Sequence, residues 1–490
     1  MAFVTRMKLE ERFPTPPWIE RNVVVILISC VVVSISFVLE LDPIPNTDKF
    51  ATFLIIALVF AAISALCRST TPPFGIQLVV LAAFCMWLTT IARSLNTHGN
   101  TVFGASHLVT VVWLLAVLVA CGIAWRSSLQ PPTDSVAAHQ RQWPKTAVWS
   151  LIVLVLLGAG AASFSASRKE GHIDVIVFEH RAGDLLAELS NPYDARVANF
   201  PDLYQGQFYD ASLTDTHHLK FGFPYTIVSL LGTGMAQIAF GEPRWAQAAA
   251  LTAGIALLLV IGRRRTQSAF GPFAVLLLMS TPATWYVLRA GYIEPILFML
   301  FALSVYAAVA RPQLLPYVLA IFFASKQYVP LLLPLLVLLV PWSQLKRRAF
   351  ALPFIATFAA ITVPPLALTG YWHSVMVVQL LQPFRIDSVS LAAAWTNHGH
   401  AEPGTLVPFL PPLVALALCL RFGRRTPAGF VTSCGFVLLA FFSFSKQSFA
   451  NYHFLVIAVF CTAIAVHDVE SASASEKPQL RDAVPAASIQ

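Results

Sequence analysis

The chain has 490 residues, of which 57% are hydrophobic and 11% charged, and its formal net charge is +8. Soluble domains carry roughly 25% charged residues. The composition therefore excludes a water-soluble chain of several domains and indicates one that spans a lipid bilayer. We interpret the positive charge as an orientation signal in inner loops rather than as a surface for nucleic acid.

Apolar runs recur along the chain with lengths near the ~20 residues that a helical membrane span requires. They predict an all-α, polytopic transmembrane protein of about 14 spans with both termini cytoplasmic. Two of the runs, 313–325 and 328–342, are short for a span perpendicular to the membrane. The predicted spans are 23–39, 51–67, 76–92, 108–125, 147–166, 245–262, 270–288, 294–310, 313–325, 328–342, 349–368, 406–420, 428–444 and 454–467.

The apolar stretch Phe223–Phe240 allows two topologies. If it is a helix on the outer membrane surface, the basic triplets 263–265 and 346–348 both face the cytoplasm; if it spans the membrane, the first triplet lies outside. Because positive charge favours the inner side, we predict a surface helix. This choice puts 20 of the 32 Lys and Arg residues inside.

Four regions follow from these assignments. Residues 1–126 form a four-span accessory region, 127–146 a polar cytoplasmic linker, and 147–467 the main transmembrane body with a large outer loop at 167–244. Residues 468–490 are small and polar, which is typical of a disordered cytoplasmic tail. The seven cysteines all lie in apolar runs without metal-binding spacing, so we interpret them as small packing residues.

The outer loop begins with a stretch whose apolar residues recur every three to four positions. In residues 172–194, Phe178 and Leu185 belong to the apolar face, which also includes Leu189, while Glu179 belongs to the polar face. This pattern predicts an amphipathic helix at the membrane interface. Asp174 stands at its start, either as a helix N-cap or solvated acid, or as a general base beside a lipid-linked substrate.

The segment resembles the GT-C superfamily of integral-membrane glycosyltransferases, and most closely the family 87-like members. The resemblance lies in Asp174 within the first long outer loop, in Leu185-Leu186 followed by Asn191-Pro192-Tyr193, and in Phe223-Pro224-Tyr225 at the next surface helix. It covers about residues 147–467. It implies a polyprenyl-phosphate sugar as donor, a glycan or glycolipid as acceptor, and Asp174 as the catalytic base.

Several cations lie at the outer ends of spans, against the positive-inside trend. Four of them are Arg289, Lys326, Arg385 and Lys446. Their positive charges face one compartment and suggest a site for an anion, such as a phosphate leaving group. Interfacial contact with lipid phosphates is the structural alternative. Asp387 could instead hold Arg385 as an ion pair. The predicted donor-phosphate contacts are Lys326, Lys446, Arg385, Arg289 and His453.

The remaining site predictions concern polar residues near the same ends. Glu294 opens a span, where an acid needs a partner, and Arg289 is the neighbouring cation that could pair with it. The pairs His217-His218 and His398/His400 are expected to be solvated rather than metal ligands, so we expect no metal and no cofactor. The predicted substrate-binding residues are Glu294, Asn191, Tyr193, Tyr225 and Asn451.

These observations predict a membrane glycosyltransferase that moves a sugar of the mannose or arabinose kind on the extracytoplasmic face, with inversion at the anomeric carbon. We expect it in a bacterial plasma membrane, surrounded by membrane lipid and without a nucleic-acid partner. A lipid-linked saccharide flippase or transporter is the first alternative, and a polysaccharide polymerase or ligase is the second. The charges at span ends, rather than in mid-span, favour the enzyme over the transporter.

Overall fold

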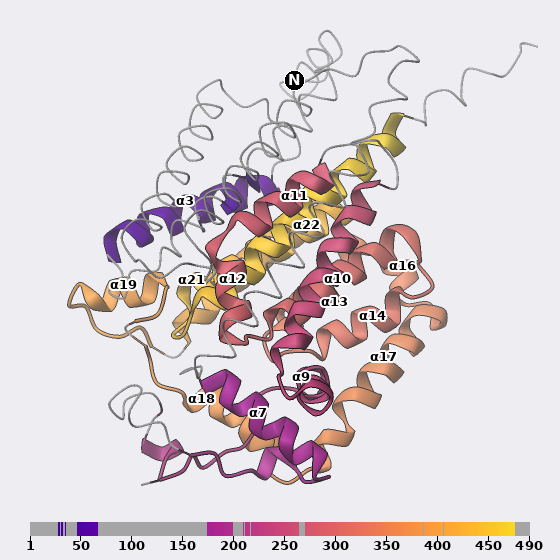
Figure 1. Cartoon of the computed structure of the whole chain (residues 1–490). Coiled ribbons are helices and arrows are strands. Elements are labelled where there is room, and N and C mark those ends of the chain that lie inside the picture. Colours follow the sequence, from indigo (N-terminus) through magenta and orange to yellow (C-terminus); the bar gives the residue numbers. More distant parts are fainter. Residues whose placement is uncertain are drawn as a thin grey trace, which may run out of the picture.

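A computed structural model describes residues 28–29, 31–32, 35, 47–66, 174–198, 209, 211–215, 217–263, 270–385, 387–404 and 406–475. These residues are helical apart from loops and two isolated β-bridges, which confirms the all-α prediction for this part of the chain. Figure 1 shows long helices forming a bundle, with short helices across one end. A second long loop is predicted at 369–405, and the helices before it are α3 (Thr47–Leu66), α7 (Asp174–Ala187), η2 (Pro192–Asp194), η3 (Ala211–Leu213), α9 (Ile227–Phe240), α10 (Arg244–Arg263), α11 (Phe270–Ser280), α12 (Pro282–Ala290), α13 (Glu294–Ala310), α14 (Leu315–Phe323), η4 (Val329–Leu335), α15 (Leu336–Leu339), α16 (Trp342–Leu345), α17 (Arg348–Thr362) and η5 (Pro364–Ala367).

The second loop and the C-terminal helices complete the described fold. α21 and α22 pack against each other and against α11, α13 and α20, so the C-terminal pair forms the centre of the core. α22 continues to Ser475, beyond the predicted end of its span at 467. These elements are η6 (His373–Val377), α18 (Val378–Leu381), α19 (Leu391–Asn397), η7 (Val407–Phe409), α20 (Leu410–Phe422), α21 (Pro427–Phe444) and α22 (Ala450–Ser475).

Within the described residues, four helical segments are long and apolar enough to cross a membrane: Arg244–Gly262, Arg348–Ala367, Pro427–Phe444 and Ala450–His467. Further apolar helices, including Glu294–Ala310, are shorter than this length. The chain is therefore an integral membrane protein with at least four candidate spans. The predicted spans 76–92, 108–125 and 147–166 and most of 23–39 lie outside the described residues, as do the linker 127–146 and the end of the tail.

Proline breaks several of the predicted spans into shorter helices. The predicted span 270–288 is divided into α11 and α12 at Thr281, because Pro282 lacks an amide hydrogen and restricts the residue before it. The predicted span 328–342 is likewise replaced by the 3-10 helix η4, which contains Pro334, followed by the single turn α15. Within the described residues, both runs are helical but irregular, and their crossing of the membrane stays a prediction.

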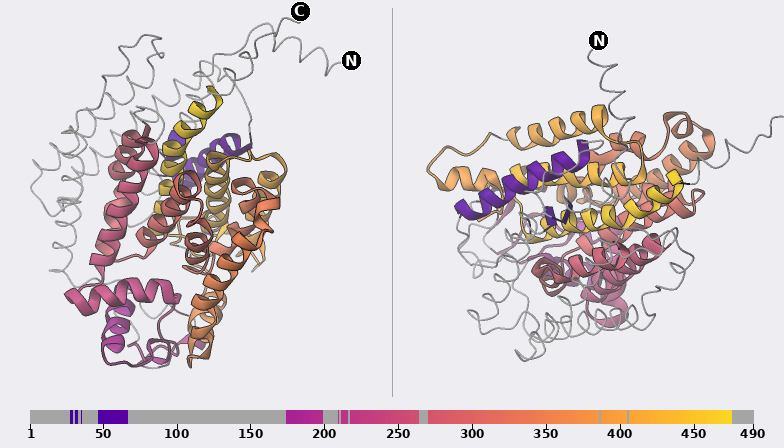
Figure 2. Two further views of the ribbon diagram at one scale, coloured as in Figure 1. Left: turned by 90° about the vertical axis from the view of Figure 1, so that its right-hand side faces the viewer. Right: turned by 90° about the horizontal axis from the view of Figure 1, so that it is seen from above.

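Helices α7 and α9 cross one end of the bundle. In the left view of Figure 2, α9 runs across the direction of the long helices, and α7 lies against it at the same end of the bundle. Their close packing depends on Gly183 and Gly234, where a Cβ atom would overlap Gln237 and Leu186 respectively. A helix at 223–240 was predicted, and α9 confirms it. Its position on a membrane surface stays a prediction.

Two residues of the predicted amphipathic helix lie differently from expectation. Glu179, predicted on the polar face, is fully buried because α10 supplies it with a hydrogen-bonding partner, Gln247. Leu189, predicted on the apolar face, is 97% exposed because α7 ends at Ala187 and Leu189 turns out of the helix with a φ of 54°. The apolar pattern therefore gave the helix correctly but extended its buried face too far.

Gly370 allows the second loop to approach the end of the first. It has a φ of +78°, and a Cβ atom there would overlap the Tyr193 carbonyl oxygen. Gly399 also has a positive φ, of +82°, but has no atom close to its Cβ position. The two glycines thus differ only in the space around them.

Gly370→Ala is expected to destabilise the protein more than Gly399→Ala. A positive φ costs an alanine about 1 kcal/mol at both positions, and overpacking adds roughly 1–3 kcal/mol at Gly370 only. Thermal unfolding of the purified variants in detergent measures the difference. Equal unfolding temperatures for the two variants would contradict the close approach of Gly370 to Tyr193.

Candidate functional site

Asp174 is the first residue of α7 and keeps part of its surface exposed. One carboxylate oxygen, Oδ1, accepts a hydrogen bond of 2.8 Å from the Val175 amide. The other, Oδ2, accepts one of 2.6 Å from the Tyr209 hydroxyl. Desolvation by the surrounding protein raises the pKa of Asp174, while these two hydrogen bonds and the positive charge of Arg385 oppose that rise.

Tyr209 is held in place by aromatic packing. Its ring lies edge-on to Phe221 at a centroid distance of 5.3 Å, and Phe221 stacks on Phe178 of α7 at 5.7 Å. Burial raises the pKa of Tyr209 well above its ordinary value, and the negative charge of Asp174 adds to the effect. The phenol therefore stays protonated and donates to the carboxylate.

Glu294 and Lys326 form a buried ion pair at the start of α13. Glu294 is 0% exposed and Lys326 5% exposed, and the ammonium group donates to Glu294 Oε1. This finding corrects the expected pairing of Glu294 with Arg289, whose side chain is exposed. Glu294 and Lys326 are 32 residues apart in the sequence. The prediction chose Arg289 because it is closer to Glu294 along the chain.

Three tyrosine rings surround the Lys326 ammonium group. Its Nζ atom lies 5.3 Å from the ring centroid of Tyr225, 5.4 Å from that of Tyr328 and 5.0 Å from that of Tyr452. Cation–π attraction and the Glu294 carboxylate together stabilise this charge away from water. Three buried polar atoms in this region have no hydrogen-bond partner among the described residues: Glu294 Oε2, Tyr328 Oη and Asn451 Oδ1.

Asp174 and the Glu294–Lys326 pair lie close enough to act on the same groups. Burial raises the pKa of Tyr225 well above its ordinary value, and the negative charges of both Asp174 and Glu294 add to this rise. Tyr225 is also the residue whose ring contacts Lys326. The start of α7, the loop before α9 and the start of α13 thus converge on one polar region at the end of the bundle.

Arg385 approaches this region from the second loop. Asp387 holds its guanidinium through two hydrogen bonds of 2.7 and 2.5 Å, and its side chain is 11% exposed. The backbone amide of Arg385 donates to the Lys446 carbonyl oxygen at 3.1 Å. The predicted Arg385–Asp387 pair is therefore present, and the positive charge of Arg385 also acts on Asp174.

Lys446 lies next to Arg385 but has protein partners of its own. Its ammonium group donates to the carbonyl oxygens of Leu380 and Gln382 at 2.8 and 2.6 Å, at the C-terminal end of α18. Partial burial lowers the pKa of Lys446 from its ordinary value. Lys446 thus stabilises the end of a helix, and its setting differs from that of Lys326 despite the shared Ser-Lys-Gln sequence.

The other predicted site residues lie in varied surroundings. His453 is buried, with Nε2 at 2.9 Å from the Val389 carbonyl oxygen. Asn191 caps η2 and donates to the Thr369 carbonyl oxygen at 2.9 Å. Tyr193 is 1% exposed and packs edge-on against Phe223 and Tyr371.

Six of the predicted site residues converge on the polar region at the end of the bundle, with Tyr452 beside them. They are Asp174, Arg385, Glu294, Lys326, Tyr225 and Asn451.

Three residues of this region carried no signal in the spacing of the sequence. Tyr209 is 35 residues from Asp174, in a part of the loop without periodicity. Tyr328 and Tyr452 lie beside predicted residues, two positions after Lys326 and one after Asn451, but their rings were not singled out. Among the described residues, no group of three or more His, Cys, Asp or Glu side chains could hold a metal ion.

Comparisons with known proteins returned one similar structure. No protein-family model matches the chain, and no curated protein matches it. The crystal structure of ArnT from Cupriavidus metallidurans bound to undecaprenyl phosphate is similar, with a TM-score of 0.40 and 16% sequence identity. The similarity covers 65% of this chain, which spans about three fifths (60%) of the ArnT chain.

Proposed function

We propose that this chain is an integral-membrane glycosyltransferase that uses a polyprenyl-phosphate sugar, with Asp174 as the general base. The observation that carries the proposal is the partly exposed Asp174 carboxylate, oriented by Tyr209 and within electrostatic reach of Arg385. A base and a cation in one polar region are the two groups that this reaction requires. The resemblance of residues 147–467 to the GT-C pattern supports the same class.

The reaction proceeds in one displacement. Asp174 accepts the proton of the acceptor hydroxyl, whose oxygen forms a bond to the anomeric carbon. The bond from that carbon to the phosphate oxygen breaks on the opposite face, and the phosphate leaves with the bonding electrons. The product therefore has inverted anomeric stereochemistry, and the sugar is of the mannose or arabinose kind.

Arg385 is the proposed contact for the leaving phosphate. Its guanidinium is fixed by Asp387 yet keeps some exposure, and an arginine can bind a phosphate through two parallel hydrogen bonds. Lys326, Lys446 and His453 are also engaged with protein groups, so a phosphate contact by any of the four residues requires a shared or exchanged partner. Their roles and that of Arg289 stay predictions.

The polar atoms around Lys326 suit the sugar. Glu294 Oε2 and Asn451 Oδ1 are buried acceptors without a described donor, and sugar hydroxyls are donors. The tyrosine rings offer flat apolar faces for the carbon side of a sugar ring. We therefore retain Glu294, Asn451 and Tyr225 as substrate-binding residues, and give Asn191 and Tyr193 the role of shaping the loop beside them.

Arg385→Gln is expected to weaken donor use. Loss of a charged hydrogen bond, worth about 1.5–3 kcal/mol, lowers kcat/KM for the donor by roughly 10- to 100-fold. The matched control is Arg181→Gln, which removes an exposed guanidinium from α7. Initial rates at varied donor concentration measure both variants, and equal kcat/KM values for them would exclude Arg385 as the phosphate contact.

The test of the proposed function uses the full chain in lipid nanodiscs with labelled polyprenyl-phosphate mannose or arabinose. Transfer of label to a glycan or glycolipid acceptor, with inverted anomeric configuration by NMR, is the expected result. Movement of the intact lipid-linked saccharide across a vesicle bilayer, without bond cleavage, would instead favour a flippase. Chains of growing length from a polymer substrate would favour a polymerase or ligase.

The domain and orientation predictions belong to the same proposal. Residues 147–467 are the proposed catalytic region, with 1–126 as an accessory region and 468–490 as a cytoplasmic tail. The proposed site faces the extracytoplasmic side of a bacterial plasma membrane. In a variant whose seven native cysteines are replaced by serine or alanine, the accessibility of Asp184→Cys and Arg347→Cys to an impermeant reagent on intact cells distinguishes the two faces.

A further inference from the structure

Glu179 is a buried acid that the proposed reaction does not use. It lies in α7, five residues after Asp174, and is 0% exposed. Burial raises its pKa well above the ordinary value; the Gln247 hydrogen bond lowers it, and the charges of Glu242 and Glu294 raise it further. Burial of a carboxyl group costs free energy of folding unless hydrogen bonds or an opposite charge compensate for the lost water.

The partner of Glu179 is the side-chain amide of Gln247 in α10. Gln247 Nε2 lies 3.1 and 2.9 Å from the two Glu179 carboxyl oxygens and 3.2 Å from the Gly291 carbonyl oxygen. A backbone carbonyl can only accept, so the nitrogen must face Gly291, and the orientation of the amide is fixed. Gln247 thus joins α7 to the turn between α12 and α13.

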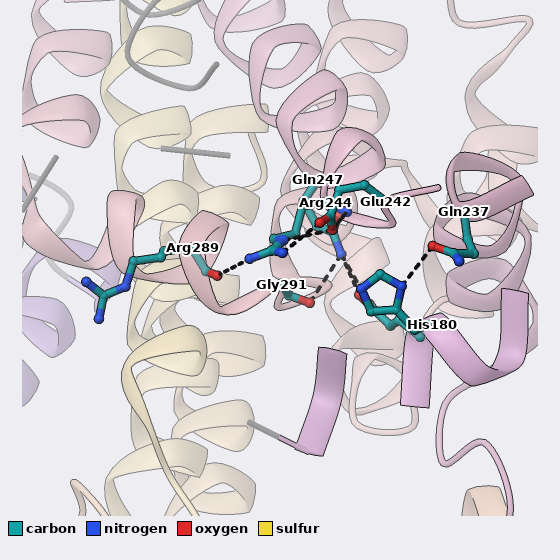
Figure 3. A network of polar contacts seen from close by, with 8 residues as sticks. His180, Gln237, Glu242, Arg244, Gln247, Arg289 and Gly291 are labelled. Carbon is teal, nitrogen blue, oxygen red and sulfur yellow. Dashed lines mark hydrogen bonds and ion pairs between the residues drawn. The ribbon is translucent and has the colours of Figure 1, made fainter. Parts of the chain in front are cut away.

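Further polar contacts between the same helices lie on both sides of this contact. Arg244 binds Glu242 through hydrogen bonds of 2.7 and 2.6 Å and donates to the Arg289 carbonyl oxygen at 3.2 Å, as Figure 3 shows. On the other side of the figure, His180 of α7 contacts Gln237 of α9 at 2.9 Å. The side chain of Arg289 points away from the network.

The turn at Gly291 leaves no room for α7 to move closer. Gly291 has a φ of +73°, and a Cβ atom there would lie 2.7 Å from Ile176 Cδ1 and 3.5 Å from Glu179 Oε2. Glu294 follows three residues later and begins α13, where it pairs with Lys326. One contact therefore connects the helix that begins with Asp174 to the helix that begins with Glu294.

The geometry points to Glu179 as a positioning residue: through Gln247 and the Gly291 carbonyl it sets the place of Asp174 relative to the Glu294–Lys326 pair. This inference rests on the proposed function, since it concerns the distance between the general base and the sugar-binding pair. The contact acts through α7 as a rigid helix and touches no substrate.

The experiment compares four single variants of the full chain, and the double variant Glu179→Leu/Gln247→Leu, in nanodiscs. Glu179→Leu removes both acceptors, Gln247→Leu removes the donor, and Glu179→Gln keeps an acceptor while resembling the protonated acid. Glu188→Gln, an exposed acid just after α7, is the matched control. Each variant is measured by hydrogen–deuterium exchange of the amides at 175–187 and by kcat and KM for sugar transfer.

Glu179→Leu and Gln247→Leu are expected to speed exchange in α7 by roughly 3- to 10-fold, the effect of losing one buried hydrogen bond. Displacement of the base by about 1 Å lowers kcat by roughly 100-fold, with little change in KM. Glu179→Gln is expected to recover most of kcat. The double variant should be no worse than either single one, because both remove the same contact.

Two results would overturn the inference. Exchange in Glu179→Leu equal to that in Glu188→Gln would show that the contact does not hold α7. Faster exchange with unchanged kcat would show a structural role without positioning of Asp174. If Glu179→Leu does not fold, Gln247→Leu reports on the same contact. If the wild type transfers no sugar, the proposed function fails, whereas the exchange measurement still decides whether Glu179 holds α7.

Discussion

Asp174→Asn is expected to abolish sugar transfer while leaving the fold intact. The asparagine oxygen can accept from the Val175 amide, and the asparagine NH2 group can donate to the Tyr209 hydroxyl oxygen, so both contacts keep a partner and local structure is retained. It cannot accept the proton of the acceptor hydroxyl, and loss of a general base costs about 10²- to 10⁴-fold in rate. Single-turnover transfer from a polyprenyl-phosphate sugar measures the effect.

The control is Asp184→Asn, an exposed acid of the same helix. It changes the same chemical group without touching the polar region around Asp174. If Asp174→Asn keeps more than about a tenth of the wild-type rate, the Asp174 carboxylate is not the general base, because the expected loss is larger than this. The control is expected to keep the wild-type rate.

The pH dependence of the wild type tests the same carboxyl group. A base acts in its deprotonated form, so kcat/KM falls as pH decreases through the pKa of Asp174. Because desolvation raises that pKa, the fall is expected at a higher pH than for an ordinary aspartate. Tyr209→Phe removes an opposing hydrogen bond, so this limb of the profile should move to still higher pH.

Lys326→Met is the change with the largest expected effect on stability. It leaves the fully buried Glu294 carboxylate without its counter-charge, and breaking a buried pair from one side costs about 3–5 kcal/mol. Replacement of both partners, as Glu294→Leu with Lys326→Met, removes the unpaired charge and should recover most of this loss. Unfolding temperature in detergent measures the single and the double variant.

Lys346→Met provides the matched control. Lys346 also lies over an aromatic ring, with Nζ 4.8 Å from the Trp342 centroid, but it is exposed. An exposed contact of this kind contributes about 0.5–1 kcal/mol, so the expected change is small. A loss in Lys326→Met as small as that in Lys346→Met would mean that Glu294 is not buried as a charge.

The bounds of several helices could be predicted from the sequence because their signals are local. The predicted span 294–310 coincides with α13, which has Pro295 in its first turn and Arg311 after its last residue. The same kind of signal was present in Thr281-Pro282, but the apolar run on either side outweighed it in the prediction. A continuous apolar run identifies a segment that avoids water. It does not reveal where the helix breaks when the residues at the break are themselves mostly apolar.

The partners within the site could not be predicted in the same way. Glu294 pairs with Lys326 across two helices, Asp174 with Tyr209 across the long loop, and Glu179 with a glutamine of α10. Each contact depends on how helices cross, and spacing along the chain carries no such information. The sequence also named Arg385 and Tyr225 as candidates, but their nearness to Asp174 became visible only in the fold.

The pairing of two distant segments has a consequence for how the second loop can vary. Arg385 and Val389 donate to the carbonyl oxygens of Lys446 and Ser448, at 3.1 and 2.7 Å, so residues 385–389 are tied to the turn between α21 and α22. The stretch 399–404 beyond α19 is mostly exposed. Exposed stretches of this kind tolerate insertions well. Changes of loop length there, including an inserted tag or a protease site, would leave the guanidinium of Arg385 where it is.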